Sequence, residues 1–112
     1  MPYLSIQTNN SVKDEEKLVK EVSSLVASKL GKPESYVMVA LQPEVTMVFG
    51  GEEGDAVFMQ LKSIGLRESE TEDLSAALCE FMDKKLGIDS SRVYIEFSNV
   101  NGSMWGWKGS TF

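Results

Sequence analysis

Histidine is absent from this sequence, and cysteine occurs once, at Cys79. A lone cysteine cannot form an internal disulfide. Without histidine, the common zinc ligand sets and the histidine-based catalytic triads are excluded. We therefore expect neither a metal ion nor another cofactor, and we interpret Cys79 as a buried small apolar residue on the second predicted helix.

Long apolar runs are also missing, because no stretch approaches the ~20 residues that a membrane-spanning helix needs. Residues 1–10 lack the basic and apolar regions of a signal peptide, so we expect a cytoplasmic protein that leaves the cell only by an unconventional route. Lys and Arg number 11 against 17 Asp and Glu, a net charge of −6. Nucleic-acid binders concentrate basic residues on one face, so we expect neither nucleic acid nor a membrane as partner.

An internal duplication with an offset of 56 positions is the strongest pattern present. In each half, apolar residues follow the spacing of one helix face, and a glycine, Gly31 or Gly87, follows the last of them as expected at a helix C-terminus. Capping boxes are predicted at 11–14 and 69–72. The two apolar sets are Leu18, Val22, Leu25, Val26 and Leu30, and Leu74, Leu78, Phe81, Met82 and Leu86.

Strand-like sequence precedes and follows each predicted helix, so the chain reads as β-α-β twice. Right-handed crossovers would merge the two units into one four-stranded mixed sheet with both helices on one face, an α+β fold. We expect a single domain over 1–112, with the glycine-rich acidic segment 49–55 as a linker between repeats. The predicted strands are 2–8, 36–41, 56–64 and 92–97, and the repeats cover about 1–49 and 55–112.

The second face of such a sheet has no helix to cover it. Segment 36–41 is apolar in both directions, as expected for a strand buried on both sides. A closed ring of subunits would cover this face, since a large exposed apolar patch is a liability on a monomer. The alternative is that residues 1–4 and the tryptophan-containing tail fold back over the sheet.

Three features could carry chemistry. After removal of Met1, Pro2 would present a secondary amine, and burial would lower its pKa from the reference value of about 7.7–8.0 toward neutrality. Lys32 could hold a carboxylate, or it could be a surface lysine that complements a helix C-terminus. The aromatic tail at 104–112 could wall an apolar pocket or pack across a subunit interface.

These features, with other short motifs, resemble the macrophage migration inhibitory factor family, which includes D-dopachrome tautomerase. The resemblance spans essentially the whole chain. It implies a homotrimer with a barrel-like arrangement of sheets and sites at the subunit interfaces, and tautomerisation of phenylpyruvate-type α-keto acids or isomerisation of dopachrome derivatives. The motifs are Met1-Pro2, Thr8-Asn9, Gly31-Lys32-Pro33, Tyr36, Phe49-Gly50-Gly51, 61–65, Arg92-Val93-Tyr94-Ile95, Gly106-Trp107 and Ser110-Thr111-Phe112.

The resemblance also implies roles for individual residues. Pro2 would be the general acid/base, Lys32 would bind the carboxylate of an enolisable keto acid, and Ile64 would supply pocket wall and main-chain contacts. Tyr94 of a neighbouring subunit would complete the site. The remaining expected substrate contacts are Tyr36, Ser63, Glu96, Trp105, Trp107 and Phe112.

Some positions depart from the family pattern. Glu96 stands where vertebrate members usually have asparagine, and its carboxylate would repel an anionic substrate and favour protonated Pro2. Lys62, at a position often occupied by histidine, would offset part of this. Ala56 and Met59 replace a Cys-x-x-Cys pair, so thiol oxidoreductase activity should be absent.

Two other functions stay open at this point. One is a non-catalytic, cytokine-like receptor-binding protein, since a binding surface leaves no mechanistic signature in one sequence. The other keeps Pro2 as the reacting amine but uses it for hydration or decarboxylation.

Overall fold

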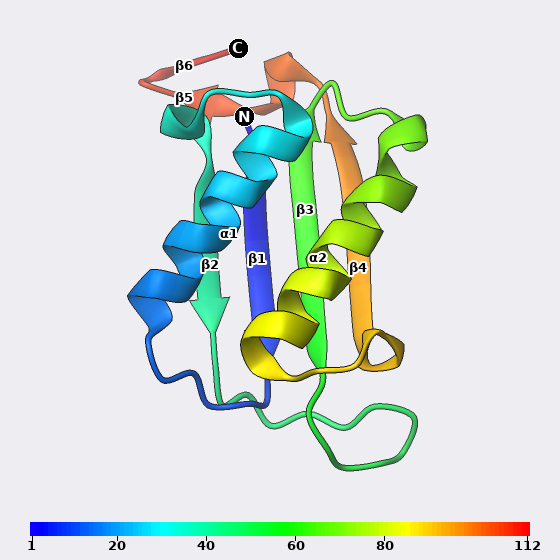
Figure 1. Cartoon of the computed structure of the whole chain (residues 1–112). Coiled ribbons are helices and arrows are strands. Elements are labelled where there is room, and N and C mark those ends of the chain that lie inside the picture. The colour runs from blue at the N-terminus through cyan, green and yellow to red at the C-terminus, as the bar shows by residue number, and fades with distance from the viewer.

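The computed structural model describes residues 1–112. Its central sheet has the order β2-β1-β3-β4, in which β1 is parallel to β2 and antiparallel to β3, and β3 is parallel to β4. Both helices cover the same face of this sheet (Figure 1), so the predicted α+β fold is confirmed. The elements are β1 Tyr3–Thr8, α1 Glu15–Leu30, β2 Met38–Gln42, β3 Val57–Ile64, α2 Thr71–Leu86, β4 Val93–Val100, β5 Gly106–Trp107 and β6 Ser110–Thr111.

The duplication recurs in three dimensions. Helix α2 begins at 71 and α1 at 15, and they end at 86 and 30, so both ends keep the offset of 56 positions. Gly31 and Gly87 end the helices with φ of 63° and 68°, a left-handed conformation that glycine adopts without steric cost. The predicted helices and their C-terminal glycines are confirmed.

The hydrophobic core lies between the helices and the sheet. Alternate residues of β1 and β3 point toward the helices, as the two-residue period of a strand requires. Cys79 is only partly buried against this core, not fully buried as predicted. The core residues are Leu4, Ile6, Leu18, Val22, Val26, Val57, Met59, Leu61, Leu66, Leu74, Leu78, Phe81, Met82, Ile88 and Val93.

The helix N-termini differ from the prediction, and neither predicted capping box forms. Asp14 caps α1, since its carboxylate accepts the Lys17 N–H at 3.1 Å, and the helix begins directly after it. Before α2 a 3-10 turn intervenes at Glu68–Glu70, where a Glu70 carboxylate oxygen accepts the Arg67 N–H at 3.1 Å. This hydrogen bond is the main reason that the pKa of Glu70 lies below its usual value.

The second sheet face is neither covered nor uniformly apolar. Strand β2 lies at a sheet edge and Met38 is 65% exposed in the single chain, so nothing within one chain buries this strand on both sides. Its burial on both sides stays a prediction that depends on a neighbouring subunit. Two amide hydrogen bonds cross the same face, from Gln7 Nε2 to Gln42 Oε1 at 2.7 Å and from Gln60 Nε2 to Glu96 Oε1 at 2.8 Å. The face therefore combines exposed apolar side chains with a polar middle.

The segment between the halves is an ordered turn. Phe49 and Glu52 form an isolated bridge, and the Arg92 guanidinium donates to the carbonyls of Phe49 at 3.1 Å and Gly54 at 3.2 Å. The same guanidinium lies 5.1 Å from the centre of the Phe49 ring. One arginine at the start of β4 thus fixes the connection into β3.

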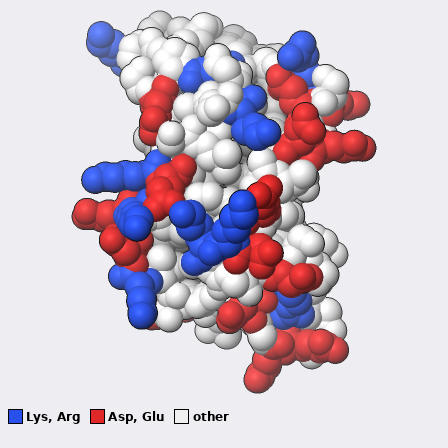
Figure 2. Space-filling view, viewed as in Figure 1, with Lys and Arg blue, Asp and Glu red and all other residues white.

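Charged side chains of both signs cover the helix side of the molecule, whereas the end where both chain termini lie is mostly uncharged (Figure 2). No helix is long and apolar enough to cross a membrane.

The observed cap of α1, Asp14, and the expected cap, Ser11, can be distinguished by substitution. Asp14→Ala should lower the free energy of unfolding by about 1 kcal/mol, because it leaves a helix N–H without its acceptor. Ser11→Ala, at the position expected to cap, should change it by less than about 0.5 kcal/mol. Urea denaturation of both variants measures this, and equal losses would contradict the assignment of Asp14 as the cap.

Candidate functional site

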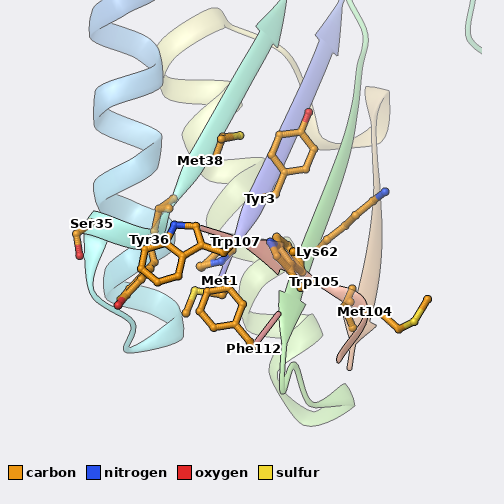
Figure 3. Close-up of a pocket in the computed structure, with 14 residues that line it drawn as sticks. Met1, Tyr3, Ser35, Tyr36, Met38, Lys62, Met104, Trp105, Trp107 and Phe112 are labelled. Carbon is orange, nitrogen blue, oxygen red and sulfur yellow. The ribbon is translucent and has the colours of Figure 1, made fainter. Parts of the chain in front are cut away.

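A pocket of about 880 Å³ opens at the end of the sheet where β1 begins. Fourteen residues line it, ten of them hydrophobic. They come from four parts of the chain: residues 1–3, residues 35–38, Lys62 on β3, and the C-terminal segment from Val100 onward (Figure 3). The pocket is thus built where the N-terminus, the start of β2 and the C-terminal tail meet.

Aromatic side chains of the tail form one wall. The rings of Trp107 and Phe112 stack with centroids 5.4 Å apart and planes at 10°, and the edge of Tyr36 meets Trp107 at 5.6 Å. The Phe112 N–H donates to the Gly102 carbonyl at 3.1 Å, which holds the last residue in place. The tail therefore walls the pocket at the end of the sheet and does not fold back across the sheet face (Figures 1 and 3).

The N-terminal residues form the floor. The Pro2 side chain is fully buried, and the Pro2 carbonyl accepts the Met38 N–H at 3.0 Å, which joins the start of β1 to β2. Burial is the larger reason that the pKa of the terminal amine on Met1 lies below its ordinary value, and the nearby Lys32 cation is the second. In the chain with Met1 attached, the Pro2 nitrogen is an amide.

Lys32 links the end of α1 to the end of β3. Its Nζ donates to the Ile64 carbonyl at 2.7 Å, in a partly buried position. Because Lys32 also acts on the terminal amine, the three residues expected to meet, Pro2, Lys32 and Ile64, lie in one region of the molecule. Of the three, only Pro2 lines the pocket; Lys32 and Ile64 do not.

Other predicted site residues lie elsewhere within one chain. Strand alternation turns Ser63 toward the helix side, where it is fully buried and its Oγ has no hydrogen-bond partner, so its side chain does not face the pocket. Tyr94 is 66% exposed on β4 and contacts Phe49 with ring centroids 4.7 Å apart. Glu96 shares that face and accepts from Gln60.

The structure adds residues that sequence reasoning did not place in the pocket. Tyr3 and Met38 line it, and they are register partners on β1 and β2. Lys62 pairs in register with Tyr3 from the other side. The period of two within each predicted strand indicated which residues share a face, but the strand order was needed to bring them together. No group of three or more Cys, Asp or Glu side chains is placed to hold a metal ion.

The sequence model that describes the macrophage migration inhibitory factor family matches residues 1–112 of this chain. The chain belongs to the macrophage migration inhibitory factor family. A homologue of this factor from Trichinella spiralis is 40% identical over 114 residues and aligns over the full length of both chains. The factor of Xenopus tropicalis is 33% identical, with 100% of this chain and 99% of that protein aligned.

Solved structures agree with this assignment. A homologue of the factor from Prochlorococcus marinus superimposes with a TM-score of 0.94 at 42% identity, covering 98% of each chain. The factor from Trichinella spiralis superimposes with a TM-score of 0.93 at 38% identity. Membership of this family supports a tautomerase-type or cytokine-like function.

The environment of the terminal amine generates a second prediction. Lys32→Gln should raise the pKa of the Met1 amine, because it removes a positive charge that disfavours the protonated form. Burial remains, so this pKa should stay below the ordinary value of 8.0. An NMR titration of protein that retains Met1, labelled with 15N at that residue, measures both effects.

Lys29→Gln is the matched control, since Lys29 is exposed one turn earlier on α1 and should leave the amine pKa unchanged. A Lys32→Gln amine that titrates as in the unmodified chain would show that Lys32 does not act on this group.

Proposed function

We propose that this chain is a cofactor-independent keto–enol tautomerase of phenylpyruvate-type α-keto acids, and of dopachrome derivatives, with Pro2 as general acid/base after Met1 is removed. The observation that carries the proposal is the position of the start of the chain: Pro2 lines the pocket, and the terminal amine on the preceding Met1 is partly desolvated and lies near Lys32. Lowering the pKa of an amine increases the fraction that is unprotonated at a given pH and so able to accept a proton.

The reaction needs one proton to move between carbon and oxygen. In the keto-to-enol direction, the neutral Pro2 amine takes a proton from the carbon beside the carbonyl. The electron pair of that C–H bond forms the enol double bond, and the carbonyl oxygen takes a proton from solvent. Pro2 then returns its proton to solvent, and the reverse sequence forms the ketone.

The surrounding residues would bind and orient the substrate. The Lys32 ammonium, held at the Ile64 carbonyl, would attract the substrate carboxylate. The wall formed by Tyr36, Trp107 and Phe112 would take an aromatic ring. Trp105 also lines the pocket, where it would narrow the entrance.

We also propose that the chain forms a homotrimer, with each site completed by a neighbouring subunit. Tyr94 and Glu96 lie on the uncovered sheet face, outside the pocket of their own chain. Tyr94, Met38 and Val48 are each more than 60% exposed, with values of 66%, 65% and 62%. Contact between subunits would bury these side chains and bring Tyr94 and Glu96 to a neighbouring pocket.

Replacement of the proposed base gives the third prediction. Pro2→Gly should lower kcat/KM for phenylpyruvate by roughly 10²- to 10⁴-fold, the usual contribution of a positioned acid/base. An extra residue before Pro2 should have the same effect, because it converts the amine into an amide. Absorbance assays of enol–ketone exchange measure both, with each N-terminus verified by mass spectrometry.

Full activity in either variant would refute Pro2 as the base. Family membership also supports a cytokine-like function, and this alternative predicts a different result for the Pro2→Gly variant. If the protein acts only as a receptor ligand, receptor binding by Pro2→Gly should equal that of the unmodified chain, and tautomerase activity should be absent from both.

A fourth prediction concerns Glu96. Glu96→Gln should raise kcat/KM for phenylpyruvate by roughly three- to tenfold, because it removes a negative charge from beside an anionic substrate. It should keep its hydrogen bond to Gln60, since a glutamine oxygen can also accept. Glu53→Gln, in the exposed turn before β3, makes the same change in net charge and should have no effect. Unchanged kinetics in Glu96→Gln would dispose of this role.

A further inference from the structure

The pocket is a basic site on an acidic molecule. Within one chain, Lys62 is the one residue with a charged side chain among the fourteen that line it, and no Asp or Glu of the same chain lines it. The chain as a whole carries 17 acidic and 11 basic residues. A cleft lined by one sign of charge, with apolar walls, concentrates ligands of the opposite sign.

Lys62 has no counter-ion within the chain. It takes part in none of the three salt bridges, which join Arg67 to Glu70, Lys84 to Glu80 and Lys85 to Glu21. Glu96, on the same face of the sheet, instead accepts a hydrogen bond from Gln60 at 2.8 Å. Within one chain, the Lys62 ammonium is therefore not paired with a carboxylate; in the proposed trimer, Glu96 of a neighbouring subunit would compete with an anionic ligand for it.

Lys62 lines the pocket, whereas Lys32 does not line it but lies near the terminal amine of Met1, which does. The Lys32 ammonium lies at the carbonyl of Ile64, two residues beyond Lys62 on β3, which corresponds to about 7 Å of strand. Figure 3 shows the Lys62 side chain extending from β3 in the direction away from Trp107 and Phe112. The region thus offers two separated cations together with an aromatic wall.

We propose that this pocket takes aryl α-keto acids that carry a second acidic group, with the keto acid carboxylate at Lys32 and the second carboxylate at Lys62. The reacting end rests on the proposed function of Pro2 and Lys32. The second anion site is additional, and it defines the ligand class: an aromatic ring, because ten of the fourteen lining residues are hydrophobic, bearing acids at two separate points.

The two tryptophans of the chain, Trp105 and Trp107, both line the pocket, so intrinsic fluorescence reports its occupancy directly. The probes are benzene-1,4-dicarboxylate and benzoate, neither of which can tautomerise. The unmodified protein should bind the dicarboxylate roughly five- to tenfold more tightly, as expected for one added hydrogen bond between charged groups in a partly exposed site.

Lys62→Gln should abolish this preference and leave benzoate binding unchanged, and Lys62→Arg should restore it. Lys20→Gln, which makes the same charge change on the exposed face of α1, should behave as the unmodified protein. Equal affinity for the two probes in the unmodified protein, or a preference that survives in Lys62→Gln, would overturn the proposal.

The binding assay is independent of the chemistry, because Pro2→Gly should keep the preference for the dicarboxylate. A kinetic comparison of 4-carboxyphenylpyruvate with phenylpyruvate then tests the reaction itself. If the preference depends on Lys62 but neither acid is turned over, the ligand class stands and the proposed tautomerase activity fails. If both acids are turned over without a Lys62-dependent preference, the tautomerase activity stands and the proposed ligand class fails.

Discussion

The hydrogen bond from the Lys32 ammonium to the Ile64 carbonyl, at 2.7 Å, is the contact on which the arrangement of the site depends. It joins the turn after α1 to the last residue of β3, two elements from different halves of the duplication. A charged donor in a partly buried position forms a stronger hydrogen bond than a neutral one. The bond therefore fixes a positive charge beside the N-terminus, where that charge and burial together lower the pKa of the terminal amine.

The C-terminal tail supplies what the repeated units cannot. Each β-α-β unit buries one sheet face under a helix, but neither unit closes the end of the sheet. The short β5–β6 hairpin and the stacked rings of Trp107 and Phe112 close that end and meet Tyr36. A Cβ added at Gly102 would lie 3.0 Å from the Phe112 carbonyl oxygen, so the close return of the chain favours a glycine there.

The local sequence pattern was sufficient to predict the helices. An apolar residue every three or four positions determines which helix face is buried, and a glycine marks the C-terminal end of each helix. The local pattern was insufficient wherever a side chain contacts a residue that is distant in the sequence. Arg92 binds carbonyls about forty positions earlier, and nothing in its neighbourhood indicates this. The caps were misplaced because several polar residues precede each helix, and the preceding chain path decides which one lies at its first turn.

The site shows the same division. Pro2, Tyr36, Trp105, Trp107 and Phe112 were expected to line the pocket and do so, since termini and aromatic residues are conspicuous in a sequence. Ser63 was misjudged by one position, because a single step along a strand exchanges the sheet faces, and its neighbour Lys62 faces the pocket instead. The alternation along β3 could have separated the two residues, but only once β3 had been placed beside β1.

Removal of Met1 would change two physical properties of this site together. While Met1 is attached, the lone pair of the Pro2 nitrogen is delocalised into the amide and is not basic, and the Met1 residue itself lines the pocket. Cleavage of that one bond would free the nitrogen and vacate part of the cavity. The full burial of the Pro2 ring in this structure includes the cover that Met1 provides, so the new amine would face the vacated space. The Lys32 cation, the second cause of the lowered pKa at Met1, would remain near the new N-terminus and would act on the Pro2 amine in the same direction.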